Sequence, residues 1–342
     1  MNKIGSSAIT GVAADIATRT QRRRILPNLF GVPFGIAGLS DAWSAAAATL
    51  GTSAAVPNAL DILSAAIWVM LVGLYFSQGA TRLLADLRDD VVSPFVSLIV
   101  ITPMLLGAGL SEYAFDAGRA IVAVFLALTV LFGGWVTGQW IVSEIDQDKM
   151  HPGYFLPTVA GGLVAAYAAA VVGMHAIAEA VFGLGIACWF LLGSLILNRL
   201  FVRPTLAAAH IPTLAIEVAP PAVAGIAYFA INGGTVDLVA TGLAGYTVLM
   251  ALVQLRLIPL YVKQHFSAAF WAFTFPYAAV ATDAAQWIRY KNPPGATAYA
   301  AIDVGLITAF IAAIFIRSAI AIARNQFLPP LPAKPAATTS SG

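Results

Sequence analysis

The chain has 342 residues, of which 60% are hydrophobic and only 10% are charged, with a mean hydropathy of +0.85. Soluble domains average about half apolar and about a quarter charged residues, so this composition excludes a soluble globular protein. The net charge of +2 is too small to indicate a nucleic-acid partner, and the single cysteine, Cys188, excludes an internal disulfide and a multi-cysteine metal site. We therefore expect an all-α integral membrane protein that carries no cofactor.

Hydrophobic stretches of about 20 residues, long enough to cross about 30 Å of hydrocarbon, recur along the whole chain. They predict ten transmembrane helices between residues 27 and 323, preceded by a basic tail (1–26) and followed by a proline-rich, disordered tail (324–342). The expected helices are residues 27–50, 58–78, 94–113, 119–142, 154–173, 177–201, 212–231, 236–260, 266–288 and 298–322.

Lysine and arginine are concentrated in the connections on one side of these helices. If the N-terminus is cytoplasmic, all of them fall on the cytoplasmic side except Arg119, Arg289 and Lys291. Positively charged connections resist translocation, which predicts a multi-pass protein of the inner (plasma) membrane with both termini in the cytoplasm. The basic cluster at residues 21–24 fits a topology signal that contacts lipid headgroups better than a nucleic-acid site.

Every odd-numbered predicted helix carries an interior proline, whereas the centres of the even-numbered helices carry none. A proline inside a membrane helix removes a backbone donor and leaves an upstream carbonyl unpaired, which lipid cannot satisfy. The alternation therefore predicts five helical hairpins in a quasi-fivefold arrangement, with the odd helices lining a central pore and the even helices forming an outer wall. The pore-lining prolines would be Pro33, Pro103, Pro157, Pro220 and Pro276.

Four separate segments resemble one family of membrane proteins. They are PNLFGVPFGIAGLSDAW from Pro27, HPGYFLPTVA from His151, IEVAPPAVAGIAYFAIN from Ile216 and FWAFTFPYAA from Phe270. In order and spacing they resemble the TehA family, which includes bacterial tellurite-resistance and C4-dicarboxylate transporter proteins and the slow-type anion channels of plant guard cells. The resemblance runs from about Pro27 to about Arg324. It implies ten helices around a central pore, and a homotrimer in which every protomer has its own pore.

The resemblance also implies a gate, because family members carry a phenylalanine on the ninth helix that occludes the pore. The matching residue here is Phe275, which directly precedes Pro276. It lies about ten residues into its helix, which is about 15 Å along the axis and near the bilayer midplane. An aromatic plug excludes hydrated ions by removing water from the constriction. Without the resemblance, Phe273 and Phe275 would be interpreted as ordinary core or lipid-facing aromatics.

Selectivity for anions would have to arise without a fixed cation, because no lysine, arginine or histidine falls in the middle of an odd helix. Backbone amides exposed at the kinks, hydroxyls such as Thr158 and Thr274, and the basic cytoplasmic mouth could supply it. Binding of this kind is weak and favours small, easily dehydrated anions. Nitrate is therefore expected to pass best, and chloride, dicarboxylates and oxyanions are the other candidate anions.

Four acidic residues on odd helices complicate this interpretation: Asp41, Glu112, Glu217 and Asp283. An ionisable residue at membrane depth is costly to desolvate and is a functional candidate by default. Glu217 lies three residues before Pro220 and is the candidate proton site. The other three lie towards the outer ends of their helices, where carboxylates facing the pore would repel anions. The sequence leaves their orientation open.

Three functions therefore compete. The first is a gated anion channel of the TehA type, and the second is a proton-coupled carrier for C4-dicarboxylates or an oxyanion such as tellurite, with Glu217 as its proton site. The third is a membrane-embedded enzyme. The four histidines fall at helix ends or connections of different hairpins, which predicts neither a catalytic residue nor a metal site; they are His151, His175, His210 and His265. The channel is the favoured interpretation.

Overall fold

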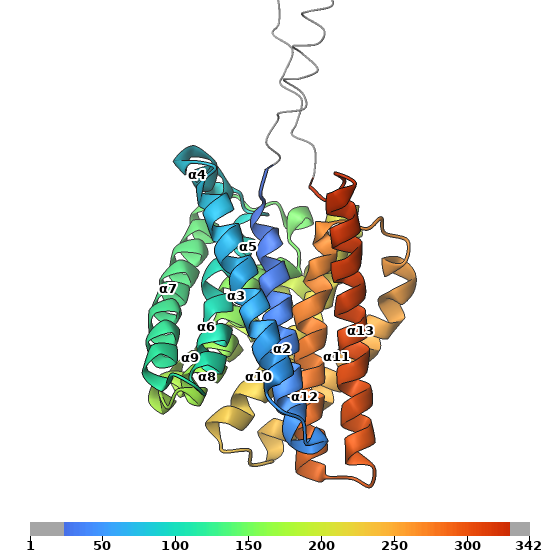
Figure 1. Ribbon diagram of the computed structural model, residues 1–342. Coiled ribbons are helices and arrows are strands. Elements are labelled where there is room, and N and C mark those ends of the chain that lie inside the picture. Colours follow the sequence, from blue (N-terminus) through green and yellow to red (C-terminus); the bar gives the residue numbers. More distant parts are fainter. Residues whose placement is uncertain (1–23, 329–342) are drawn as a thin grey trace, which may run out of the picture.

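A computed structural model describes residues 24–328, so most of the two predicted tails lies outside the described residues. The described chain is almost wholly helical, and none of residues 24–328 belongs to a β-strand. Its first and last segments emerge at the same end of an elongated helical bundle (Figure 1). We call this the terminal end. The opposite, distal end carries the connections at residues 51–54, 111–114, 172–174, 232–237 and 292–295.

Five segments, each built from a short irregular helix followed by an α-helix, form the interior of the bundle. They are η1 and α2 (Pro27–Phe30, Gly31–Leu50), α5 and α6 (Ser93–Val96, Leu98–Leu110), η3, η4 and α8 (Pro152–Phe155, Leu156–Ala160, Gly161–Val171), η5 and α10 (Ala208–Val218, Ala219–Ile231), and η6 and α12 (Ala268–Phe273, Thr274–Lys291).

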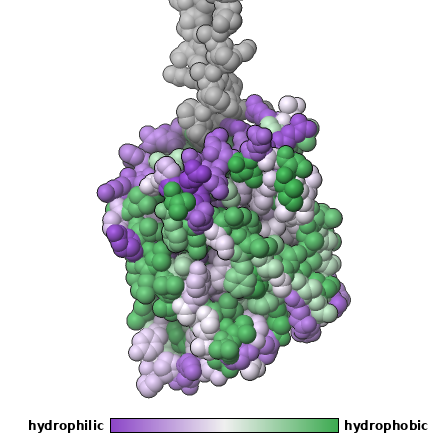
Figure 2. Space-filling model, turned by 180° about the vertical axis from the view of Figure 1, so that it is seen from behind, coloured by the Kyte–Doolittle hydropathy of each residue, from purple (hydrophilic) through white to green (hydrophobic). Residues whose placement is uncertain are grey.

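Five long, uninterrupted helices surround the interior. They are α3 (Ala55–Phe76), α7 (Phe115–Val142), α9 (His175–Val202), α11 (Leu238–Tyr261) and α13 (Ala296–Ala323). In the most apolar stretch of each outer helix, only 17 to 28% of residues are buried. In the corresponding stretches of three inner segments 67 to 83% are buried; these segments are Ser93–Leu110, Pro152–Val171 and Ala208–Ile231. On the face shown in Figure 2, hydrophobic residues cover much of the middle of the molecule, and hydrophilic residues gather towards its ends. This pattern fits immersion in a bilayer.

The inner helices close into a ring. Helix α2 packs on α6, α6 on α8, α8 on α10 and α10 on α12, and α12 returns to pack along α2. Each inner helix also packs on the outer helix that follows it in the chain. The ring therefore encloses a central axis that runs from the terminal end to the distal end.

Eight helical segments of residues 24–328 are long and apolar enough to cross a membrane. The predicted spans missing from these eight are 27–50 and 266–288, which correspond to α2 and α12. Helix α2 is dominated by glycine, alanine and serine, and α12 ends in polar and basic residues, so both have a lower hydropathy. The membrane class is confirmed, and the count of ten stays a prediction.

Four of the five prolines fall where these inner segments change from irregular to α-helical structure. Pro33, Pro220 and Pro276 lie in the first turns of α2, α10 and α12, and Pro157 lies in the π-helical turn η4. The first N–H groups of a helix have no partner within it, so a proline there removes no helical hydrogen bond. Only Pro103, in the middle of α6, behaves as the sequence analysis expected of all five.

The carbonyl that Pro103 frees is satisfied by an outer helix. Because Pro103 has no N–H, the carbonyl of Ile99, four residues upstream, has no helical donor. The indole N–H of Trp68 on α3 donates to this oxygen at 3.0 Å. This bond fixes α6 against α3 and turns the freed carbonyl away from the central axis.

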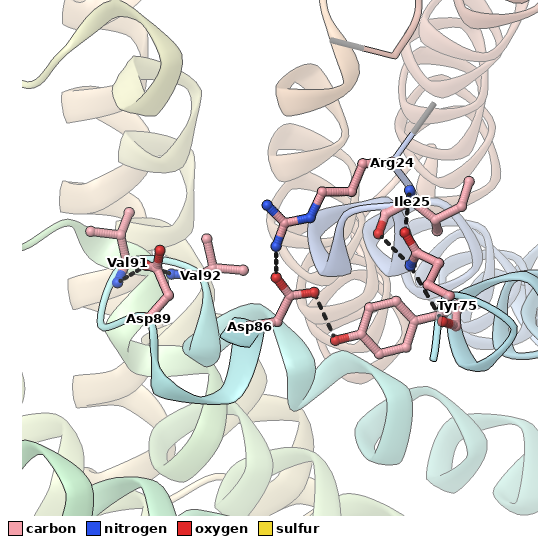
Figure 3. Close-up of polar contacts among 8 residues, drawn as sticks. Arg24, Ile25, Tyr75, Asp86, Asp89, Val91 and Val92 are labelled. Carbon is pink, nitrogen blue, oxygen red and sulfur yellow. Dashed lines mark hydrogen bonds and ion pairs between the residues drawn. The ribbon is translucent and has the colours of Figure 1, made fainter. Parts of the chain in front are cut away.

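Side chains of α3, of α4 (Ala80–Arg88) and of the connection between them hold the start of the described chain at the terminal end (Figure 3). Asp86 is fully buried, forms an ion pair with Arg24 and accepts a hydrogen bond from the hydroxyl of Tyr75 at 3.1 Å. The amide of Gln78 exchanges two hydrogen bonds with the backbone of Ile25, at 3.1 and 2.9 Å. These contacts set the position at which the chain enters the bundle, directly before η1.

Candidate functional site

A cavity of about 400 Å³ lies inside the ring on the side of the terminal end, and we call it the vestibule. All five inner segments line it, as do residues of the connections that lead into them. Its wall is almost entirely apolar. One lining residue from each inner segment is Phe34, Leu98, Val159, Pro220 and Phe275.

A second, much smaller cavity of about 20 Å³ lies further along the same five helices, and we call it the distal cavity. Its lining includes Gly38 and Asp41 of α2, Leu105 of α6 and Tyr167 of α8. Phe275 lines both cavities. Val223 of α10 also lines both, so Val223 and Phe275, which is only 7% exposed, lie where the two cavities adjoin.

Helix α2 determines how the Phe275 ring is held. The ring of Phe34 stacks on it with centroids 3.7 Å apart and an interplanar angle of 19°. On the same helix, a Cβ atom added to Gly38 would lie 2.9 Å from Cδ2 of Phe275, closer than such atoms approach in proteins. Gly38 therefore provides the space that the ring fills, and Phe34 covers one of its faces.

Close packing of α2 on α12 brings these residues together. A Cβ atom added to Gly35 would lie 1.9 Å from Oγ1 of Thr274 and 2.6 Å from its Cβ, and one added to Gly31 would lie 3.5 Å from Cβ of Trp271. Small residues one turn apart allow two membrane helices to approach closely. Here they place the first turn of α12, which carries Phe275, directly against α2.

The five prolines do not share one environment. Pro220 and Pro276 line the vestibule. Pro33, Pro103 and Pro157 do not belong to the lining of either cavity described above, and their pore-lining role stays a prediction. They lie on faces of the inner segments that contact outer helices. The carbonyl of Pro33 accepts a hydrogen bond from Ser64 of α3 at 2.8 Å, Trp68 of α3 caps the Pro103 kink, and Pro157 lies against Gly133 of α7.

The three predicted polar residues of the pore also lie away from these cavities. Thr158 faces Gly133 of α7, and its hydroxyl has no hydrogen-bond partner among the described residues. Thr274 is fully buried and donates to the carbonyl of Trp271 at 2.8 Å. Glu217 is buried as well, and its Oε1 atom has no partner within residues 24–328. None of the three lines the vestibule or the distal cavity.

Of the acidic residues whose orientation the sequence left open, Asp41 lines the distal cavity. Asp61 of α3, which the sequence analysis did not single out, interacts electrostatically with both Asp41 and Glu112. Glu112 is exposed at the distal end, and the Asp283 carboxylate faces Gly225 of α10 without lining either cavity. Acidic side chains therefore lie beyond the vestibule, towards the distal end.

Polar groups at the mouth of the vestibule escaped the sequence analysis. They are Asn28, His210, Thr213, Ser267 and Gln326. His210 is the one side chain in the described lining of the vestibule that can become positively charged. Its ring stacks on that of His151, with centroids 4.8 Å apart and an interplanar angle of 5°, so two histidines expected in separate hairpins lie together. No sequence signal marks this contact, because it joins the ends of two distant connections.

Comparison with known proteins assigns the family. Residues 24–319 match the sequence model of the SLAC1 family, which is described as a family of voltage-dependent anion channels. The chain is also similar to a tellurite resistance protein TehA homolog of Haemophilus influenzae, with 29% identity over 276 residues that cover 79% of this chain and 84% of the relative. The matched region includes every inner segment that lines the vestibule and the distal cavity. The chain belongs to the SLAC1/TehA family of anion channels and transporters.

Proposed function

We propose that this protein is a gated anion channel in which anions move along the axis of the inner ring and Phe275 closes the path. One observation carries the proposal: Phe275 lines both a vestibule of about 400 Å³ and a distal cavity of about 20 Å³, and the same five helices line the two cavities. An aromatic side chain at such a constriction excludes water and so blocks hydrated ions. Displacement of the ring would join the two cavities.

The vestibule favours anions through its backbone. The first turns of α10 and α12, with Pro220 and Pro276, line it. Helix N-termini carry partial positive charge, which stabilises anions nearby. No carboxylate belongs to the described lining of the vestibule, whereas its apolar surface penalises strongly hydrated ions. Nitrate and chloride are therefore the expected permeant anions, ahead of dicarboxylates and oxyanions.

The number of membrane spans, the oligomeric state and the orientation are part of the same proposal. Helices α2 and α12 close the inner ring, so we propose that they cross the membrane with the other eight segments, as ten spans in five hairpins. We further propose a homotrimer with one pore in each protomer, in the inner membrane, with the terminal end in the cytoplasm. Residues 24–26 and 324–328 then face the cytoplasm.

Anion flux into proteoliposomes tests the gate, with Phe275→Ala compared against Phe273→Ala. Phe273 is a matched control, because it is also buried in the same segment but packs on Tyr261 and Phe310 and lines neither cavity. We expect a large rise in nitrate and chloride flux for Phe275→Ala and none for Phe273→Ala. Equal flux from both variants, each folded, would contradict the proposal.

A proton-coupled carrier is the second candidate, favoured by the buried Glu217 carboxylate with its unpartnered oxygen. Such a carrier would move a C4-dicarboxylate, or an oxyanion such as the tellurite in the relative's name, with a proton held at Glu217. It predicts saturable flux that follows the pH gradient and stops in Glu217→Gln. A channel would keep conducting in this variant, so a single set of flux measurements separates the two functions.

A further inference from the structure

Three aromatic rings stack at the mouth of the vestibule. His151, which directly precedes η3, lies between Phe95 and His210, with ring centroids 5.5 Å and 4.8 Å away and interplanar angles of 17° and 5°. Phe95 and His210 line the vestibule, whereas His151 is fully buried. The stack joins three inner segments where they meet the cavity.

His151 is a fixed, neutral member of this stack. Its Nδ1 atom accepts a hydrogen bond from the backbone N–H of Gly153 at 3.0 Å. Its Nε2 atom lies 3.2 Å from the carbonyl oxygen of Val91 and must therefore carry the proton and donate it. Burial, and to a lesser extent the neighbouring His210, hold the pKa of His151 well below its usual value. His151 thus serves as an uncharged surface against which His210 packs.

Unlike those of His151, the ring nitrogens of His210 are available to bind a solute. His210 is only partly buried, and its ring nitrogens make no hydrogen bond to any described residue. Its backbone is held, because its carbonyl accepts a hydrogen bond from the Thr213 hydroxyl at 2.6 Å and its N–H donates to Ala207 at 2.8 Å. The imidazole is therefore fixed at the cavity wall with its N–H groups available to a solute.

Two charged residues of neighbouring elements influence this stack. Burial disfavours the protonated form of His210, and Asp89, in the connection before α5, favours it to a lesser extent. The Asp89 carboxylate already accepts hydrogen bonds from the backbone N–H groups of Val91 and Val92 (Figure 3). Arg199 of α9 acts electrostatically on His151, and its guanidinium is occupied by backbone carbonyls of two connections. Neither residue lines the vestibule.

We infer that His210 is the anion-binding residue at the mouth of the vestibule, and that its protonated imidazole attracts a small inorganic anion from the solution at the terminal end. The neutral His151 ring backs it without competing for the anion. This inference rests on the proposed channel function and adds its entry site. It explains how a pore without a fixed cation acquires a positive charge that depends on pH, since histidine is the side chain that titrates between about pH 5 and 8.

Flux of nitrate and chloride tests the inference in the Phe275→Ala background, with the pH at the terminal end set to 8 and then to 5. A unit charge about 5 Å from an anion raises its local concentration roughly fourfold even at the dielectric constant of water. We expect about that increase or more in the parent and in His265→Gln, a control in the exposed connection between α11 and η6. In His210→Gln the flux should stay low at both pH values, and in His210→Lys it should stay high at both.

Two results would overturn the inference alone: a pH-dependent rise in His210→Gln equal to that of the parent, or a flux in His210→Lys no higher than in His210→Gln. A Phe275→Ala background that carries no anion flux at either pH would overturn the proposed channel and the entry site together. The two failures are therefore distinguishable within one experiment.

Discussion

Gly38 on α2 is the residue on which the position of the Phe275 ring most directly depends. A Cβ atom there would lie 2.9 Å from Cδ2 of Phe275 and 3.2 Å from Cβ of Ala278, and Phe34 blocks one face of the ring at a centroid distance of 3.7 Å. Gly38→Ala must therefore separate α2 from α12 or rotate the ring. Overpacking of this kind costs about 1–3 kcal/mol.

A double-mutant cycle with Phe275→Ala isolates this contact. With the ring removed, the added methyl group keeps only its 3.2 Å contact with Cβ of Ala278, so the cost of Gly38→Ala should fall to about 1 kcal/mol or less, leaving a coupling energy of about 1–2 kcal/mol. Equilibrium unfolding in mixed micelles measures all four variants. Gly134→Ala on α7 is the control, because a Cβ there meets nothing within 4 Å and alanine gains up to about 1 kcal/mol over glycine in a helix.

An equal free-energy cost of Gly38→Ala with phenylalanine and with alanine at position 275 would contradict this assignment. That result would mean that the ring does not occupy the space beside Gly38. A Gly38→Ala protein that is destabilised only in the presence of Phe275, and that passes more anions than the parent, would instead show that the methyl group displaces the ring from the constriction.

The remaining predictions concern stability. Trp68→Phe should destabilise the fold by about 1–3 kcal/mol, because it leaves the Ile99 carbonyl without a donor. Pro103→Ala restores an N–H within α6, so Trp68→Phe should cost less in the Pro103→Ala background. An unchanged cost would contradict the assignment of this hydrogen bond. Because the pKa of His151 is lowered in the folded protein, the unfolded chain binds a proton at His151 that the folded protein does not. The free energy of unfolding should therefore fall as the pH drops below about 6.5, by at most about 1.4 kcal/mol per pH unit. Thermal unfolding in detergent between pH 8 and 5 checks this, and His151→Gln should flatten the slope.

Composition and proline spacing were sufficient to predict the membrane class and the division into inner and outer helices. Long runs of leucine, valine and isoleucine mark helices that face lipid, and α7 and α9 are exposed as their sequences indicate. Prolines mark the inner segments for a reason that differs from the one expected. Pro33, Pro220 and Pro276 begin α-helices after irregular turns, and a sequence does not distinguish a proline that starts a helix from one that bends it.

The orientation of polar side chains on the inner segments could not be predicted. A helix buried on all sides has no polar face from which its rotation could be read. Thr158 and Thr274 accordingly face neighbouring helices, whereas Asp41 reaches the distal cavity. Phe275 itself was identified through the family resemblance, since by its residue type and depth alone it is equivalent to Phe273.

Contacts between distant connections were the least accessible to sequence reasoning. Arg199 of α9 donates to the carbonyl oxygens of Asp148 and Pro204, at 2.7 and 2.8 Å, and so ties together the connections that lead to His151 and His210. Each of these residues, taken singly, is an ordinary feature of a helix end. Only the folded arrangement brings the two imidazoles together at the vestibule.

Thiol accessibility on the two sides of Phe275 tests the central claim most directly. Single cysteines at Ala272, in the vestibule, and Ala279, in the distal cavity, would be placed in a Cys188→Ala background and treated from the terminal end with a small, membrane-impermeant reagent. With Phe275 present, only the cysteine at position 272 should react, and Phe275→Ala should make the cysteine at position 279 reactive from the same side. If the cysteine at position 279 reacts equally fast with and without the ring, Phe275 does not close the path.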